Sequence, residues 1–199
     1  MDTSKQGILI QTILPIFSGI LFSFLIFYQF TYTNPLSQFF LGDVKRNQWI
    51  AHFDQSMKGQ NPWLRNYVAF TGLLGSVRPE IIYLETMRDD SDTPLLGMND
   101  YILKGVAPDC RYWSFVTYDF HNERIEPHEQ TIASSHRTIL NDFGEYEIII
   151  TDNPTKYPDK HTIIHGGKDF NIVMRIYGPK LSYYDNKNTL PVASILPMK

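Results

Sequence analysis

The chain has 199 residues and a formal net charge of −3, and its 18 basic and 21 acidic side chains are well mixed, so no basic face indicates a nucleic-acid partner. Its aromatic content, with 13 Phe, 12 Tyr and 3 Trp, favours strands over helices. The only cysteine is Cys110, which excludes an internal disulfide.

The first predicted element is a membrane-spanning helix. Residues 6–42 contain no charged side chain, and residues 8–30 within them form a 23-residue apolar stretch. At about 1.5 Å per residue this stretch would span roughly 34 Å, enough for a hydrocarbon core of about 30 Å. A cleaved signal peptide would have a shorter apolar run and a cleavage site with small residues, and neither is present. We therefore expect residues 1–33 to be a single-pass anchor in the lipid bilayer.

The side of the membrane depends on the charges that flank this stretch. Lys5 and the terminal amine face Lys45 and Arg46 across it, which is nearly a tie under the positive-inside rule. Long domains translocate largely irrespective of such charges. We therefore expect the following domain on the non-cytoplasmic side.

A linker and a short helical cover are expected over residues 34–74. Pro35 ends the preceding helix, and from residue 44 onward Trp, Phe and Tyr recur three to four positions apart. This spacing indicates one or two short helices that pack over the core. A role at the membrane surface is the alternative.

Residues 75–199 show the pattern of a mainly β domain. Short runs rich in β-branched and aromatic residues are each closed by Gly, Pro, Asn or Asp. Without helical crossovers between them, they predict an antiparallel β-sandwich or barrel rather than a parallel α/β sheet. The predicted strands are residues 80–87, 100–106, 112–120, 145–151, 162–165 and 171–177.

Two motifs resemble a known family. Residues 108–119 (PDCRYWSFVTYD) and 170–180 (FNIVMRIYGPK) are similar to the conserved ends of the domain-of-unknown-function family numbered 1214. The resemblance extends over about residues 72–197. Further matching segments are residues 81–84, 89–97, 101–103 and 190–192, the last resembling the family's terminal Pro-Val strand.

The same resemblance has two gaps. Residues 127–137 lack an Asn-Arg-Tyr-like stretch, and residues 161–165 replace the family's Asn-Trp, so the resemblance does not extend to a ligand site built from those elements. The resemblance implies a β-sandwich or jelly-roll-like fold, and it implies no reaction.

Neither a metal site nor a cofactor is expected. His161 and His165 are four apart on a predicted strand, which places them roughly 13 Å apart. Asp89, Asp90 and Asp92 lack the glycine that a calcium loop requires, so a solvated turn is expected.

No catalytic residue is expected either. Ser134, Ser135 and His136 lie outside any G-x-S-x-G elbow, and adjacent strand residues rarely point at one another. Cys110 is interpreted as a small buried hydrophobe.

Arg175 stands out as a charge within an otherwise apolar strand. Alternation places it on one face with Val173 and Tyr177. One interpretation is a buried ion pair with Asp119, and the other is a group that binds an anion or a sugar. The candidate ligand-binding residues are Arg111, Tyr112, Trp113, Tyr118, Asp119, Arg175 and Tyr177.

Taken together, these features predict a membrane-anchored, non-catalytic β-sandwich that acts by protein–protein contact. Its partner would be a membrane complex, with this chain as an accessory subunit, or an envelope or virion. The alternative is an enzyme or a carbohydrate or small-ligand binder that uses a cleft near Trp113 and Arg175.

Overall fold

The structure is a computed structural model that describes residues 15–26, 28, 44–53 and 80–198. The chain divides into two compact units, Met1–Phe40 and Leu41–Lys199. In the first unit, residues 15–26 form a helix whose large apolar side chains are exposed. Within the described ranges, no helix has both the length and the apolar character needed to cross a membrane. The predicted span over residues 8–30 lies partly outside these ranges.

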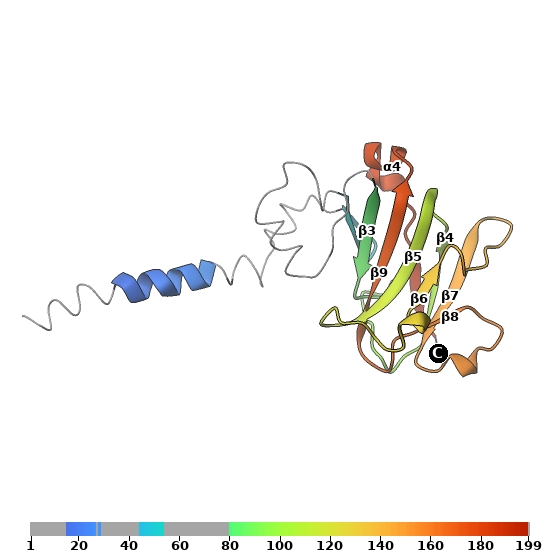
Figure 1. The fold of residues 1–199 in the computed structure, drawn as a ribbon, viewed down its shortest axis with the longest axis horizontal. Coiled ribbons are helices and arrows are strands. Elements are labelled where there is room, and N and C mark those ends of the chain that lie inside the picture. Colours follow the sequence, from blue (N-terminus) through green and yellow to red (C-terminus); the bar gives the residue numbers. More distant parts are fainter. Residues whose placement is uncertain (1–14, 27, 29–43, 54–79, 199) are drawn as a thin grey trace, which may run out of the picture. The chain divides into compact units, whose positions relative to one another are not determined.

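The second unit consists of two β-sheets packed as a sandwich (Figure 1). Every adjacent strand pair is antiparallel except β7 and β8, which are parallel. The six-stranded sheet has the order β1 (Val44–Arg46), β2 (Trp49–His52), β3 (Ile81–Thr86), β9 (Phe170–Pro179), β5 (Cys110–Asp119) and β6 (Ile132–Ser134). The four-stranded sheet has the order β10 (Ser194–Pro197), β4 (Tyr101–Val106), β7 (Glu145–Thr151) and β8 (Thr162–Ile164).

Within the described residues, four short helical turns connect these strands. Three are 3-10 helices and one is a single α-helical turn. They are η1 (His128–Gln130), η2 (Pro154–Lys156), α4 (Ser182–Asp185) and η3 (Lys187–Thr189).

The core lies between the sheets and is rich in aromatic rings. The Phe115 ring centre lies 6.1 Å from that of Trp49, 5.6 Å from that of Trp113 and 5.4 Å from that of Tyr146. On β9, alternate residues from Phe170 to Ile176 join this core. Alternation along the strands therefore sends one set of side chains inward and leaves the other on the outer face of the sheet.

That outer face of the six-stranded sheet carries a second, smaller apolar cluster. It consists of buried Ile81, Tyr83 and Val173, with half-buried Tyr118 and Tyr177 packed against it. Arg175 lies on the same face, between Val173 and Tyr177 on β9, as the alternation predicted.

The predicted strands are confirmed, with ends that shift by at most two residues. Three expectations were wrong. Residues 44–46 and 49–52 form strands rather than helices, whereas the rest of the expected helical cover, residues 54–74, lies outside the described residues. The sandwich is not wholly antiparallel, because β8 pairs in parallel with β7. The last strand begins at Ser194 rather than at residue 190.

Candidate functional site

Arg175 is held by a tyrosine rather than by a carboxylate. It lies on β9 between Tyr83 of β3 and Ser114 of β5. Its Nη2 donates a hydrogen bond of 2.7 Å to the Tyr118 hydroxyl, and its Cζ lies 5.6 Å from the centre of that ring. Among the described residues, no carboxylate forms an ion pair with this half-buried guanidinium. The Tyr118 hydroxyl and the π face of its ring therefore stabilise the half-buried charge of Arg175.

Two more tyrosines extend this surface along the sheet. Tyr112 is directly opposite Tyr177 in the β5–β9 ladder, and their ring centres are 5.6 Å apart. The His136 ring lies 5.3 Å from Tyr112 on the other side. We call Tyr112, Tyr118, Arg175 and Tyr177 the aromatic row, and all four are half-buried. The row presents aromatic faces and a cation to the outside of the sheet.

The predicted pair between Arg175 and Asp119 was wrong. Asp119 is opposite Phe170, five positions along the ladder from Arg175, which separates the two by about 17 Å. Asp119 instead closes a turn, since its Oδ1 accepts hydrogen bonds from the backbone amides of His121 (3.0 Å) and Glu123 (2.9 Å). Burial alone would raise the pKa of Asp119, but these two bonds and the Lys168 charge hold it below its usual range.

Trp113 and Arg111 also lie away from the aromatic row. Trp113 is 3% exposed and packs in the core, on the opposite face of the sheet from Arg175. Arg111 is exposed, and its side chain covers Gly178, where a Cβ would lie 2.7 Å from the Arg111 Nε. The structure thus brings together four of the seven predicted site residues and separates Arg111, Trp113 and Asp119 from them.

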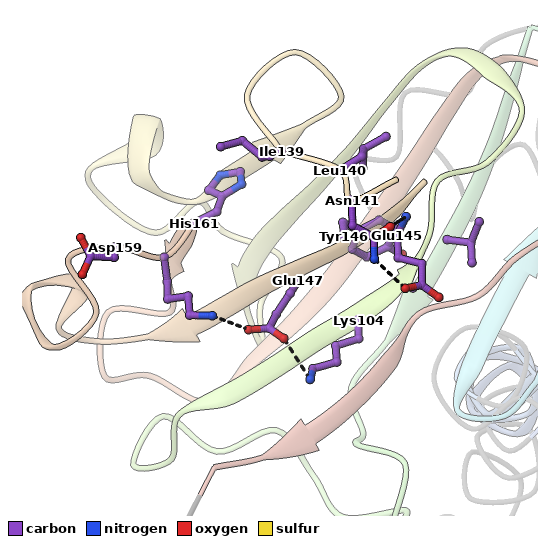
Figure 2. Close-up of a pocket in the computed structure, with 12 residues that line it drawn as sticks. Lys104, Ile139, Leu140, Asn141, Glu145, Tyr146, Glu147, Asp159 and His161 are labelled. Carbon is purple, nitrogen blue, oxygen red and sulfur yellow. Dashed lines mark hydrogen bonds and ion pairs between the residues drawn. The ribbon is translucent and has the colours of Figure 1, made fainter. Parts of the chain in front are cut away.

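A groove that the sequence did not reveal lies at the other sheet (Figure 2). It encloses about 670 Å³ beside β7, between the loops that contain Ile139–Leu140 and Asp159–His161. On its rim the Glu147 carboxylate accepts from Lys104 Nζ at 2.9 Å and from Lys160 Nζ at 3.1 Å. These two lysines, Lys104 first, lower the pKa of Glu147.

Apolar and half-buried polar groups line the same groove. Ile139 is 88% exposed and Leu140 is 41% exposed, and the two are adjacent in the chain. The His161 Nδ1 is buried without a hydrogen-bond partner among the described residues, and burial together with the Arg137 charge lowers the pKa of His161. Burial also raises the pKa of Tyr146, which lines the groove from the core side. The sequence signal for this site was the apolar Ile139–Leu140 pair in the loop before β7.

No metal centre is built from the part of the chain that the structure describes. No three His, Cys, Asp or Glu side chains gather there closely enough to hold an ion. His165, a candidate ligand in the sequence, is buried, and its Nδ1 accepts from the Gly167 amide at 3.1 Å.

Comparison with known families gives a match over most of this sandwich. The profile of "Protein of unknown function (DUF1214)" matches residues 80–181, which are 102 of the 199 residues. The chain belongs to the DUF1214 family. The DUF1214 region contains all four residues of the aromatic row and the whole groove. Family membership therefore covers both surfaces without assigning a reaction to either.

The same fold is found in a longer protein of known structure. The crystal structure of the VPA0106 protein from Vibrio parahaemolyticus is similar with a TM-score of 0.57 and 20% identity, over 71% of this chain and 36% of that one. An uncharacterized protein from Burkholderia cenocepacia matches with a TM-score of 0.46 and 16% identity, over 63% of this chain and 31% of that one. This DUF1214 chain thus spans about a third of the length of these structures. A comparison with curated proteins finds no match.

Proposed function

We propose that this DUF1214 protein is a membrane-anchored, non-catalytic interaction module whose aromatic row is the contact surface for a protein partner. The observation that carries this proposal is the composition of the row, three tyrosines and one arginine on a single sheet face. Tyr and Arg are among the residues that most often dominate binding energy at protein interfaces.

The hydrogen bonding of Arg175 supports the same proposal. A guanidinium has five N–H donors, and in the described residues only the Nη2 bond to Tyr118 is made. The remaining donors are suited to a partner carboxylate, which a guanidinium grips with two parallel hydrogen bonds. The rings of Tyr112 and Tyr177 beside it would supply rigid contact area at a low cost in conformational entropy.

The N-terminal stretch supports the anchored part of the proposal. Residues 8–30 are uncharged, and the described helix over residues 15–26 exposes large apolar side chains along its whole length. We place this stretch in the bilayer and the sandwich on the non-cytoplasmic side. The module would then serve as an accessory subunit of a membrane complex or as an envelope or virion component.

Capture of the partner in a native membrane extract tests the contact surface. The full-length protein, purified in mild detergent, is expected to retain a stoichiometric partner that Arg175→Ala loses. Arg124→Ala, which removes an exposed arginine outside the row, is the matched control and should retain it. A monomeric wild-type protein without a partner, or equal retention by both variants, would contradict the proposal.

A second candidate function is the binding of an anionic sugar at the same row. The observation that favours it is the Arg175 guanidinium beside the paired Tyr112 and Tyr177 rings, because sugars stack on aromatic faces while a guanidinium binds a carboxylate. Titration with glucuronate, followed by calorimetry, distinguishes the two. If glucuronate binds and Arg175→Ala abolishes that binding, the result favours a sugar ligand. If glucuronate does not bind, the result favours a protein partner.

A further inference from the structure

The edge of β7 is open at one residue. β7 pairs with β4 over residues 145–150 but with β8 only over residues 149–151. On that side the Glu145 carbonyl accepts from the Asn141 amide, and the Ile149 amide donates to the His161 carbonyl, both at 2.9 Å. Glu147 lies midway between these two bonds.

The backbone of Glu147 therefore points into the groove. In a strand, every second residue directs its N–H and C=O to the same side, so Glu147 faces the side that Glu145 and Ile149 face. No group in the described ranges bonds to the Glu147 amide or carbonyl on that side. An unpaired N–H and C=O at a sheet edge form a template for one residue of another extended chain.

The groove beside this edge has the size and the walls that a short peptide needs. Its volume is about 670 Å³, and the exposed side chains of Ile139 and Leu140 form its apolar wall (Figure 2). Two such exposed apolar side chains next to an open edge are typical of a binding surface.

The charges that line the groove indicate the charge of the peptide that it would bind. Its lining includes two lysines and three carboxylates, a net charge of −1. Both lysines bind the same carboxylate, that of Glu147. Glu145 and Asp159 form no ion pair with any described residue, so the negative charge of the groove lies at these two exposed side chains.

We propose that this groove binds an extended peptide segment of basic and apolar residues, which pairs with β7 at the single residue Glu147. One residue of the segment closes both hydrogen bonds to the Glu147 backbone. Its apolar side chains pack on Ile139 and Leu140, and its basic side chains meet Glu145 and Asp159. This pairing is a one-residue form of the strand-addition mode of peptide recognition, in which main-chain bonds give affinity and side chains give specificity.

A defined pentapeptide tests each part of this proposal on the full-length protein in detergent micelles. The probe is fluorescein-labelled Lys-Val-Ser-Val-Lys-amide, whose lysines and valines lie on opposite faces when it is extended. Fluorescence anisotropy measures affinity, and hydrogen exchange followed by NMR locates the site. Peptide binding is expected to slow exchange of the Glu147 amide while leaving the amides of β9 unchanged.

Two altered peptides separate the backbone from the charges. N-methylation of the central serine removes the donor to the Glu147 carbonyl and should weaken binding about tenfold. Replacing both lysines by glutamates should also weaken binding. Ile139→Ser should weaken it, whereas Met98→Ser, at a similarly exposed residue outside the groove, should not.

Three results would overturn the proposal. The first is the absence of binding by the Lys-Val-Ser-Val-Lys probe up to about 1 mM. The second is equal affinity of the N-methylated peptide, which would mean that the Glu147 backbone is not used. The third is broadening of the Ile139 amide by a lipid-borne spin label in phosphatidylcholine nanodiscs, which would assign the apolar wall to the bilayer instead.

Discussion

Arg175 and Asp119 should contribute to stability independently of each other. Asp119→Ala removes two hydrogen bonds from backbone amides, at 2.9 and 3.0 Å, and should lower the free energy of unfolding by about 2–3 kcal/mol. Arg175→Met removes one bond to the Tyr118 hydroxyl but leaves an apolar stem on the sheet, so we expect a loss of about 1 kcal/mol. The double variant should equal the sum to within about 0.5 kcal/mol, because the residues are far apart.

Urea unfolding of the full-length protein in mild detergent measures these losses, with the fluorescence of buried Trp49 and Trp113 as the signal. A second cycle, Arg175→Met with Tyr118→Phe, is the positive control and should show a coupling of about 0.5–1 kcal/mol. If the coupling between Arg175 and Asp119 exceeds the coupling between Arg175 and Tyr118, the two charges interact. The strand register described above would then be wrong.

Three further predictions concern the core, a close backbone contact and pH. Phe115→Ala should cost about 3–5 kcal/mol in urea unfolding, because this ring is fully buried among other aromatic rings. Gly97→Ala should cost about 2–3 kcal/mol by the same measurement, because its Cβ would lie 2.4 Å from the Gly167 backbone. Burial lowers the pKa of both His161 and His165, so the unfolded chain takes up protons first as pH falls below about 6.5. The free energy of unfolding should therefore drop between about pH 7.5 and about pH 5.5, and replacing both histidines with glutamine should flatten that drop.

The long strands were predictable from the sequence because their side-chain pattern is strong. β7 and β9 are runs of β-branched residues closed by turn residues, and both were located to within two residues. The strands at Val44–Arg46 and Trp49–His52 have only three and four residues, too few to show a period of two. β1 pairs with β2, and β2 pairs with β3, which is a tertiary effect, whereas aromatic spacing alone suggested helices there.

The candidate site was less predictable because it depends on register. Alternation within β9 correctly placed Arg175 with Val173 and Tyr177, but the residue opposite it on β5 is set by how the two strands align. The turn at Asp119 had a local signal, since an Asp that ends a strand and is followed by Asn122 favours an Asx turn. The open edge at Glu147 had none, because it depends on where β8 begins beside β7.

The two proposed surfaces belong to different sheets, so each can be tested without the other. The aromatic row lies on the outer face of the six-stranded sheet, whereas Glu147 lies on the four-stranded sheet, with the core between them. Packed sheets are about 10 Å apart and turn their outer faces in opposite directions, so one flat partner surface cannot cover both. Arg175→Ala should therefore leave peptide affinity unchanged, and Ile139→Ser should leave partner capture unchanged. If either variant weakens both peptide binding and partner capture, a change in the sandwich itself is the simpler explanation. That variant would then assign neither binding function to its surface.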